Sequence, residues 1–295
     1  MLEFDRVTKR YGDTVALQDL TFSVRPGEMF GFVGANGAGK TTSMRIAMGV
    51  LLADSGEVRW NGAPVTFETR QRFGYMPEER GLYPKMRVGE QLEYFGRLHG
   101  LDPAAARAAA EHWTDALGVA ERRGDPVDRL SLGNQQRVQL AAALVHHPEV
   151  LILDEPFSGL DPVGVDALAE VLLGRCRAGV PVIFSSHQLD LVERLCDSVG
   201  IINAGHMVAT GTVGELRARE GRRQLRIVVP DAEPGWAGGL PGVTVVSEND
   251  GEVLLELAGV DDQTVLAAAM RTGRVEHFSW RQPTLTELFR EVVAA

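Results

Sequence analysis

A glycine-rich segment near the N-terminus has the residue types and the spacing of a phosphate-binding loop. Residues Gly34–Thr41 read GANGAGKT, which matches the pattern GxxxxGK(S/T). They stand between the buried apolar run Met29–Val33 and an amphipathic helical pattern. In that setting, backbone N–H groups and the positive end of the helix converge on a phosphate chain. The expected nucleotide-binding residues are Gly34, Asn36, Gly37, Ala38, Gly39, Lys40, Thr41 and Thr42.

Two adjacent carboxylates follow a second buried apolar run, because Val150–Glu155 reads VLILDE. Acids at the end of a buried strand are costly unless a cation or a substrate uses them, although a solvated strand end is the simpler alternative. With the glycine loop present, we assign Asp154 and Thr41 to Mg²⁺, Lys40 to the β- and γ-phosphates, and Glu155 to the general base that polarises the attacking water. The two motifs together predict a Mg²⁺-dependent P-loop nucleotidase.

A third motif precedes the acids, where Leu130–Arg137 reads LSLGNQQR. With this motif the chain resembles the ATP-binding subunits of ABC transporters, whose signature loop is LSGGQ-like. Ser131 and Gly133 match that loop, while Leu132 and Asn134 replace the usual glycine and glutamine. A serine hydroxyl and glycine amides at a helix N-terminus form an anion site without a lysine. Alone, the motif would indicate only a helix cap; in this order of motifs it predicts a second phosphate site.

The resemblance gives roles to four further residues. Tyr11, in KRYGD, resembles the aromatic residue that stacks on adenine, and Asp161, in SGLD, resembles the loop that couples two active sites across a dimer. His187, at the end of PVIFSSH, resembles the switch histidine that contacts the γ-phosphate. Glu78 stands where the family more commonly has glutamine, so its carboxylate offers an oxygen to Mg²⁺ but adds negative charge near the triphosphate.

Two other segments resemble one branch of this family, the sodium-extrusion and drug-export type of ATP-binding subunit. They are Pro77–Met86, which reads PEERGLYPKM, and the tail segment Pro283–Val292, which reads PTLTELFREV. The resemblance covers residues 1–220 through several ordered motifs and the rest of the chain more loosely.

Length and composition agree with a two-domain globular chain. The 295 residues are 44% hydrophobic, and no run approaches the roughly 18 apolar residues of a membrane-spanning helix. The net charge of −10 includes no basic arm, so we expect no nucleic-acid partner. Cys176 and Cys196 lack metal-ligand spacing and are expected to be free thiols.

The expected fold is α/β. The resemblance implies a RecA-like ABC nucleotide-binding domain in residues 1–221, with an antiparallel β subdomain and a helical subdomain at about 79–147. A charged linker is expected at Arg219–Arg223, followed by a small α+β accessory or regulatory domain in residues 222–295. In this tail, strands are predicted at Leu225–Val229, Val243–Val246 and Glu252–Leu257, and helices begin at Asp261 and, with a capping box, at Thr284.

The resemblance also implies a function: an ATP-hydrolysing subunit that powers a separately encoded transmembrane exporter from the cytoplasmic face of the cell membrane. Two ATP-binding domains, as a homodimer or an ABC–ABC heterodimer, would enclose each ATP between Gly34–Thr42 of one copy and Ser131–Gly133 of the other. Glu155, His187 and Lys40 would be catalytic, Thr41, Asp154 and Glu78 would hold Mg²⁺, and Glu78–Met86 with the helical insert would dock on the membrane protein.

Two other functions fit the same motifs. One is a non-transport ABC ATPase that acts on ribosomes or DNA as a mechanical clamp, although such proteins usually have a second cassette, a coiled-coil insert or basic arms. The other is a regulatory protein with a decayed ATPase, against which the presence of Lys40, Asp154 and Glu155 argues.

Overall fold

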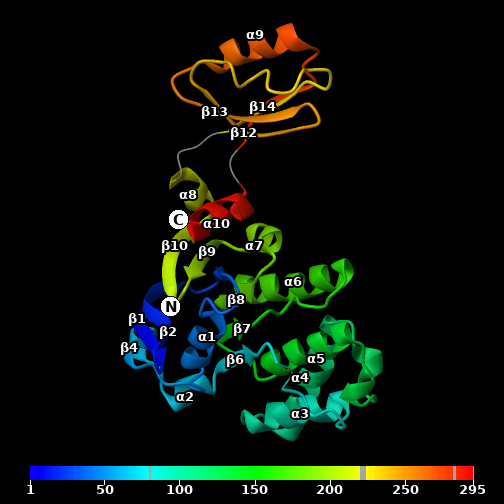
Figure 1. Ribbon diagram of the computed structural model, residues 1–295. Helices are drawn as coiled ribbons and strands as arrows, with labels where there is room; N and C mark the ends of the chain where they lie inside the picture. The colour runs from blue at the N-terminus through cyan, green and yellow to red at the C-terminus, as the bar shows by residue number, and fades with distance from the viewer. Residues whose placement is uncertain (80, 220–223, 282–283, 295) are drawn as a thin grey trace. The chain divides into compact units, whose positions relative to one another are not determined.

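A computed structural model describes residues 1–79, 81–219, 224–281 and 284–294 of the chain (Figure 1). The chain divides into two compact units, Met1–Val213 and Gly214–Ala295. The predicted domain boundary at residue 221 and most of the predicted linker Arg219–Arg223 lie outside the described residues. The two units are described separately below.

The larger unit is built on a six-stranded sheet with the strand order β10-β9-β3-β8-β7-β6. Strands β3, β6, β7, β8 and β9 run parallel, and β10 pairs antiparallel with β9. Every residue of β3, β7 and β8 is buried, as expected for strands that are covered on both faces. The bounds are β3 Met29–Val33, β6 Phe73–Met76, β7 Val150–Leu153, β8 Val182–Ser186, β9 Ser198–Asn203 and β10 His206–Thr212.

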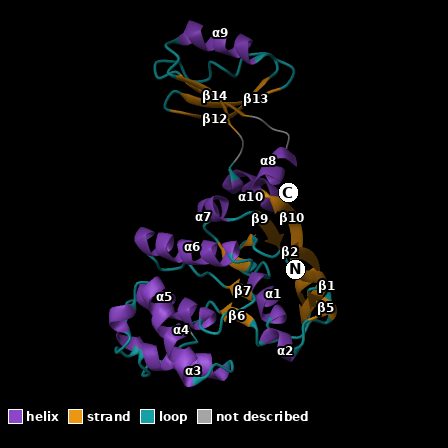
Figure 2. Ribbon diagram, turned by 180° about the vertical axis from the view of Figure 1, so that it is seen from behind, coloured by secondary structure: helices purple, strands orange, loops and turns teal. Residues whose placement is uncertain are grey.

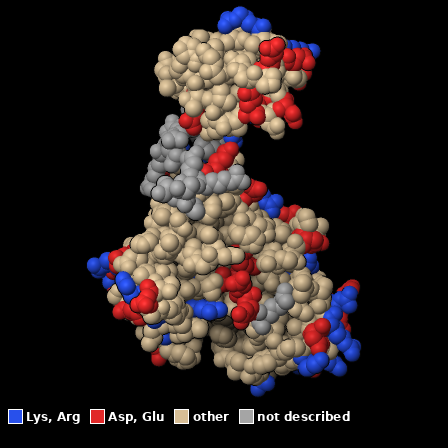
Figure 3. Space-filling view, viewed as in Figure 1, with Lys and Arg blue, Asp and Glu red and all other residues tan. Residues whose placement is uncertain are grey.

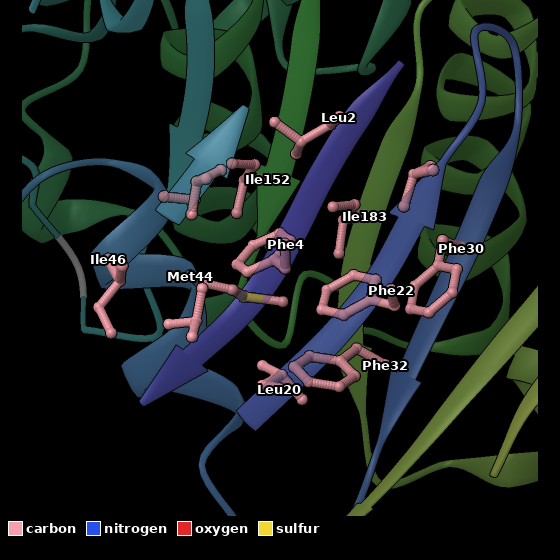
Figure 4. Packing of buried hydrophobic residues seen from close by; sticks show 14 of the residues in the cluster. Leu2, Phe4, Leu20, Phe22, Phe30, Phe32, Met44, Ile46, Ile152 and Ile183 are labelled. Atoms are coloured by element: carbon pink, nitrogen blue, oxygen red, sulfur yellow. The ribbon is translucent and has the colours of Figure 1, made fainter. Parts of the chain in front are cut away.

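A second, antiparallel sheet packs against this one, with the order β2-β1-β4-β5. Its strands are β1 Leu2–Tyr11, β2 Thr14–Val24, β4 Ser55–Trp60 and β5 Ala63–Pro64, and the short helix α2 spans Phe67–Arg70. The main core contains side chains of both sheets and of helix α1, Lys40–Ala47 (Figure 4). The Phe22 ring stacks on Phe4 and Phe30, with centroid distances of 4.3 and 5.0 Å. This packing fixes β3, from whose end the glycine loop begins.

Helices α3 Val88–Leu98, α4 Pro103–Ala116 and α5 Leu132–Leu144 gather on one side of the larger unit in both ribbon views (Figures 1 and 2). Asp102 caps α4 by accepting hydrogen bonds from the backbone N–H groups of Ala104 and Ala105, each at 2.9 Å. Short 3₁₀ turns at Ala120–Arg122 and Val127–Arg129 lead into α5. Two further helices, α6 Pro162–Arg177 and α7 Leu189–Leu195, complete this unit.

The smaller unit contains a four-stranded antiparallel sheet with the order β12-β13-β11-β14. The α9 side chains Val265 and Ala269 share a core with Leu225, Ile227 and Leu255 of this sheet. The predicted capping box is present, because the Glu287 carboxylate accepts a hydrogen bond from the Thr284 N–H at 2.8 Å. The bounds are β11 Gln224–Val228, β12 Val243–Asn249, β13 Glu252–Leu257, α9 Asp262–Thr272, β14 His277–Arg281 and α10 Leu285–Ala294. Helix α8, Val213–Arg219, begins at the last residue of the larger unit. Neither α8 nor β14 was predicted from the sequence.

Within the described parts of the chain, no helix has both the length and the apolar composition that crossing a bilayer requires.

The end of α5 approaches β6 closely, and a stacked pair of histidines, the half-buried His146 and the exposed His99, lies beside this contact. A side chain at Gly74 would meet the Ala143 carbonyl oxygen at 2.3 Å, so the helix and the strand pack here without room for a Cβ. His146 Nε2 lies 3.1 Å from the Phe73 carbonyl oxygen, and its ring stacks on His99 with centroids 3.7 Å apart. Burial, assisted by His99, lowers the pKa of His146 to about 4.

His146 should therefore make the stability of the larger unit depend on pH. The unfolded chain binds this proton near pH 6.5, whereas the folded protein does so only near pH 4, so folding stability is lost as the pH falls through that interval. Between about pH 7.5 and pH 5, we expect wild type to lose about 2 kcal/mol more than His146→Gln, whose amide still donates to a carbonyl. Urea unfolding of both proteins at both pH values measures the difference; parallel losses would contradict the assignment.

Candidate nucleotide site

The glycine loop joins the end of β3 to the start of α1, as the sequence predicts. Gly37 and Gly39 have left-handed backbone conformations, with φ of 79° and 113°. A side chain at Gly39 would also meet the Ala16 carbonyl oxygen at 2.7 Å, so this position requires glycine. The loop faces a pocket of about 270 Å³ that is lined by Asn36, Gly37, Ala38, Gly39, Lys40, Thr41, Thr42, Glu78, Asp154 and Glu155.

Lys40 lies in this pocket with its ammonium group turned back onto the loop. Its Nζ donates hydrogen bonds to the carbonyl oxygens of Gly34 at 2.7 Å and Ala35 at 3.2 Å. Burial lowers the pKa of Lys40, and the carboxylates of Glu155, Asp154 and Glu78 act in the opposite direction. A phosphate in the pocket would compete with the two loop carbonyls for the same ammonium group.

Asp154 is the first residue after β7 and is only 1% exposed. Its Oδ1 accepts a hydrogen bond from Ser185 Oγ at 2.6 Å. Its Oδ2 is buried and accepts no hydrogen bond from any residue that the structure describes. A buried carboxylate oxygen without a donor is costly unless a cation binds it. Because Thr41 and Glu78 line the same pocket, the oxygen donors there fit a Mg²⁺ ion.

Glu155 follows Asp154 and is held from several sides. Its carboxylate accepts a hydrogen bond from His187 Nδ1 at 3.0 Å, and its backbone has a left-handed φ of 51°. Burial raises the pKa of Glu155, while the hydrogen bond from His187 and the charge of Lys40 oppose the rise. The expected base, the expected switch histidine and the loop lysine therefore lie together. Acidic side chains also gather near the middle of the face of the larger unit that Figure 3 shows.

The signature residues form a second pocket, separate from the glycine loop. Ser131 caps α5, and its hydroxyl accepts a hydrogen bond from the Asn134 N–H at 3.3 Å. Asp161 caps α6 in the same way, through the Gly164 N–H at 2.8 Å. The pocket has a volume of about 350 Å³ and is lined by Ser131, Leu132, Gly133, Asn134, Arg137, Gly159, Leu160 and Asp161.

Tyr11 belongs to neither set of pocket-lining residues. It ends β1 with 49% of its surface exposed, and Lys9 Nζ lies 5.7 Å from its ring centroid. Gly34, the first residue of the loop, does not line the first pocket, and a Cβ there would meet the Ile202 carbonyl oxygen at 2.5 Å. The roles that the sequence analysis assigns to Tyr11, to Gly34 and to the residues of the two pockets stay predictions.

The sequence reasoning missed two glutamines of α5 that connect the helix to the first pocket. Gln136 Nε2 donates hydrogen bonds to the carbonyl oxygens of Glu155 and Pro156, each at 3.0 Å. Gln139 Nε2 donates to the Pro77 carbonyl oxygen at 2.6 Å, next to Glu78. Both glutamines are buried, at 6% and 4% exposure. The sequence did contain a signal for them. Gln136 and Gln139 are three residues apart, so they lie on the same face of the helix, among apolar neighbours such as Val138 and Leu140.

Comparisons with known proteins agree with this architecture. Residues 17–158 match the family described as ABC transporter, and residues 211–293 match the C-terminal domain of DrrA1-3-like ATP-binding proteins. The ABC transporter ATP-binding protein YhaQ of Bacillus subtilis is 38% identical over 100% of this chain and 99% of its own length. The chain belongs to the ABC transporter ATP-binding proteins.

Relatives of this ABC transporter ATP-binding protein include proteins named for resistance and export. The daunorubicin resistance ATP-binding protein DrrA3 of Streptomyces coeruleorubidus is 33% identical, over 97% of this chain and 93% of its own. The Nod factor export ATP-binding protein I of Paraburkholderia xenovorans is 37% identical, over 78% of this chain and 77% of its own.

Solved structures support the fold of the ATP-binding protein. The ATP-binding subunit of an ABC transporter superposes with a TM-score of 0.70 and 32% identity, over 75% of this chain and 93% of its own. A dimeric bacterial ABC transporter cassette gives a TM-score of 0.67 at 21% identity, over 72% and 98% of the two chains, which supports the fold alone. The predicted α/β ABC fold and the predicted family are thus confirmed.

Proposed function

We propose that this ATP-binding protein hydrolyses ATP with Mg²⁺ and thereby powers a separate transmembrane exporter. One observation carries the proposal: Glu155, which accepts a hydrogen bond from His187, lines the same pocket as Lys40 and as Asp154, whose Oδ2 has no hydrogen-bond partner among the described residues. A base, a phosphate-binding cation and a candidate metal ligand then face the loop amides that would hold a triphosphate.

The charges around the pocket explain why a divalent cation would be needed. Glu78, Asp154 and Glu155 contribute three carboxylates, against the single ammonium group of Lys40. A triphosphate is also anionic, so its approach is repulsive unless positive charge is added. Thr41, Asp154 and Glu78 would hold Mg²⁺, which when bound neutralises charge on the phosphate oxygens. Lys40 would exchange the loop carbonyls of Gly34 and Ala35 for the β- and γ-phosphates.

Glu155 would then activate the attacking water. Its carboxylate accepts the proton as the water oxygen bonds to the γ-phosphorus, and the bond to the leaving ADP oxygen breaks. A raised pKa makes a carboxylate a stronger base, which suits this role. The His187 ring, now bonded to Glu155, orients that carboxylate and would contact the γ-phosphate.

We infer that two ATP-binding domains complete each site head to tail, as a homodimer or with a second ABC chain. The second pocket, which holds Ser131, Gly133 and Asp161, is the surface of one copy that would meet ATP on the glycine loop of the other. The N-terminus of α5 gives this pocket the amides and the positive helix end that suit a phosphate. Tyr11, exposed at the end of β1, would stack on the adenine.

The names of the relatives support export as the purpose of the cycle, since they include daunorubicin resistance and Nod factor export proteins. The chain would act as a peripheral subunit at the cytoplasmic face of the cell membrane. It would dock on the membrane protein through Glu78–Met86 and the helices that follow. In this segment Tyr83 exposes 52% of its surface, which leaves its ring accessible to a partner. The C-terminal residues, proposed as a domain from residue 222, would be accessory or regulatory.

Replacing Glu155 by glutamine tests the hydrolytic proposal. The amide keeps the shape of the side chain but cannot accept the proton of the water, so we expect turnover to fall about 100-fold or more. Nucleotide affinity should stay within about threefold of wild type, because the loop and Lys40 are unchanged. Phosphate release and fluorescent-nucleotide binding measure the two quantities, and Glu121→Gln, at an exposed position, is the control. Wild-type hydrolysis by Glu155→Gln would refute the role of Glu155.

Replacing Glu78 by glutamine tests its predicted place beside the cation. The change removes one negative charge from the pocket, so nucleotide binding in EDTA should tighten about threefold to tenfold. The further gain in affinity on adding Mg²⁺ should shrink, because a neutral amide is a weaker cation ligand than a carboxylate. Glu79→Gln is the matched control, since Glu79 is exposed and does not line the pocket. Unchanged binding under both conditions would place Glu78 outside the site.

Co-purification tests the transport role. When this chain carries a tag and is expressed with a membrane protein encoded beside it, we expect the two to purify together in detergent and ATP hydrolysis to respond to the membrane protein. A variant with Tyr83→Ala should weaken the association, whereas Leu52→Ala, at another exposed apolar residue, should not. A chain that hydrolyses ATP but associates with ribosomes instead would favour the clamp function.

A further inference from the structure

Ser185 lies between the two acids that follow β7. Its side chain is completely buried, and its hydroxyl makes two hydrogen bonds. Oγ donates to Asp154 Oδ1 at 2.6 Å and accepts from the Glu155 N–H at 2.8 Å. A serine hydroxyl has one proton to donate and lone pairs that accept, so this single group satisfies both neighbours together.

The register of the sheet brings Ser185 to this position. Strands β7 and β8 run parallel, and Leu153 pairs with Phe184 as the last residue of β7. Asp154 therefore leaves the sheet beside Ser185, while β8 continues next to β3, where Phe32 pairs with Ser185. The hydroxyl thus belongs to β8, which is paired with a strand on each side, and it contacts Asp154 and Glu155, the two residues that follow the end of β7.

The hydrogen bond to Asp154 separates the roles of the two carboxylate oxygens. Oδ1 accepts a short hydrogen bond from the serine hydroxyl, and a hydrogen bond to a charged acceptor is of the strong kind. Oδ2 then stays without a hydrogen-bond donor among the described residues, in the pocket where the cation is expected. Loss of the hydroxyl would leave both oxygens without a donor and the carboxylate free to rotate.

The hydrogen bond from Glu155 holds a strained backbone. A φ of 51° is uncommon for a residue other than glycine and persists only when its surroundings fix it. Ser185 binds the N–H of Glu155 at 2.8 Å, and Gln136 binds its carbonyl oxygen at 3.0 Å. With both backbone groups fixed, the Glu155 side chain is aimed at His187.

We propose that Ser185 is a positioning residue for ATP hydrolysis: its hydroxyl orients the Asp154 carboxylate toward the cation and fixes the backbone that presents Glu155 to water. This inference rests on the proposed function, because it needs Asp154 to bind Mg²⁺ and Glu155 to act as the base. A serine that only filled space would contribute to stability and leave the cation dependence unchanged.

The test compares Ser185→Ala, Ser185→Cys and Ser185→Thr with Ser198→Ala as the matched control. Ser198 is also a buried serine of the central sheet that donates to a buried carboxylate, that of Glu28, and it does not line the nucleotide pocket. Two quantities are measured: kcat and KM for ATP, and the gain in fluorescent-nucleotide affinity on adding Mg²⁺. The second is measured with Glu155→Gln also present, so that no turnover contributes.

Ser185→Ala should lower kcat about tenfold or more and reduce the Mg²⁺-dependent gain in affinity about tenfold, as expected for the loss of a hydrogen bond to a charged group. Nucleotide binding in EDTA should change less than about twofold, because the loop and Lys40 are untouched. Ser185→Thr, which keeps the hydroxyl, should restore both quantities to within about threefold. Ser198→Ala should leave both unchanged even if it unfolds at a lower temperature.

Three outcomes would overturn the proposal. In the first, Ser185→Ala keeps wild-type kcat and Mg²⁺ dependence while Glu155→Gln alone is inactive, so Ser185 has no positioning role and the proposed function stands. In the second, Ser198→Ala loses as much kcat and as much Mg²⁺-dependent affinity as Ser185→Ala does, so both losses would be general effects of disturbed packing. In the third, Glu155→Gln alone hydrolyses ATP like wild type, so both the proposed function and this inference are refuted. If Ser185→Ala does not fold, Ser185→Cys decides, because a thiol fills similar space but hydrogen-bonds weakly.

Discussion

The burial of β3, β7 and β8 on both faces is the constraint on which the rest of this molecule depends. Strands covered on both faces cannot carry charged side chains along their length, so the charges gather where parallel strands end at one edge of the sheet. At that edge the glycine loop follows β3, the two acids follow β7 and His187 follows β8. The site is therefore assembled by the order of strands in the sheet, from segments far apart in sequence.

The residues at this edge depend on each other for their hydrogen bonds. Ser185, in β8, supplies one bond to each residue of the acid pair, and Gln136, in α5, supplies the bond to the carbonyl of Glu155. Within the described part of the chain, Asp154 Oδ2 is the oxygen of this acid pair that is buried without a hydrogen-bond donor. The network thus fixes most polar groups and leaves unsatisfied the one that suits a cation, which is the arrangement expected of a prepared binding site.

The sequence alone predicted much of the site, because its chemistry is local to short motifs. The glycine loop, the acids after VLIL and the helix cap at Ser131 each follow from residue types at fixed spacing. The contribution of Ser185 could not be predicted in this way, since it depends on the register of β8 beside β7. The spacing of Gln136 and Gln139 marks a polar face on α5, but the groups that they bind are set by the packing of that helix. Strand β14 was also missed, because His277–Arg281 alternates weakly and pairs with a strand more than 45 residues earlier.

Helix α5 connects the second pocket to two loops of the first pocket through its two buried glutamines. It is 13 residues long, or about 20 Å at 1.5 Å per residue, and is stiff over that length. Its N-cap Ser131 and its first-turn residue Gly133 line the second pocket. Gln136 and Gln139 donate hydrogen bonds to the backbones of the loops that contain Glu155 and Glu78. A tilt of α5 at its signature end would therefore displace both loops together, because the same stiff helix is hydrogen-bonded to each of them.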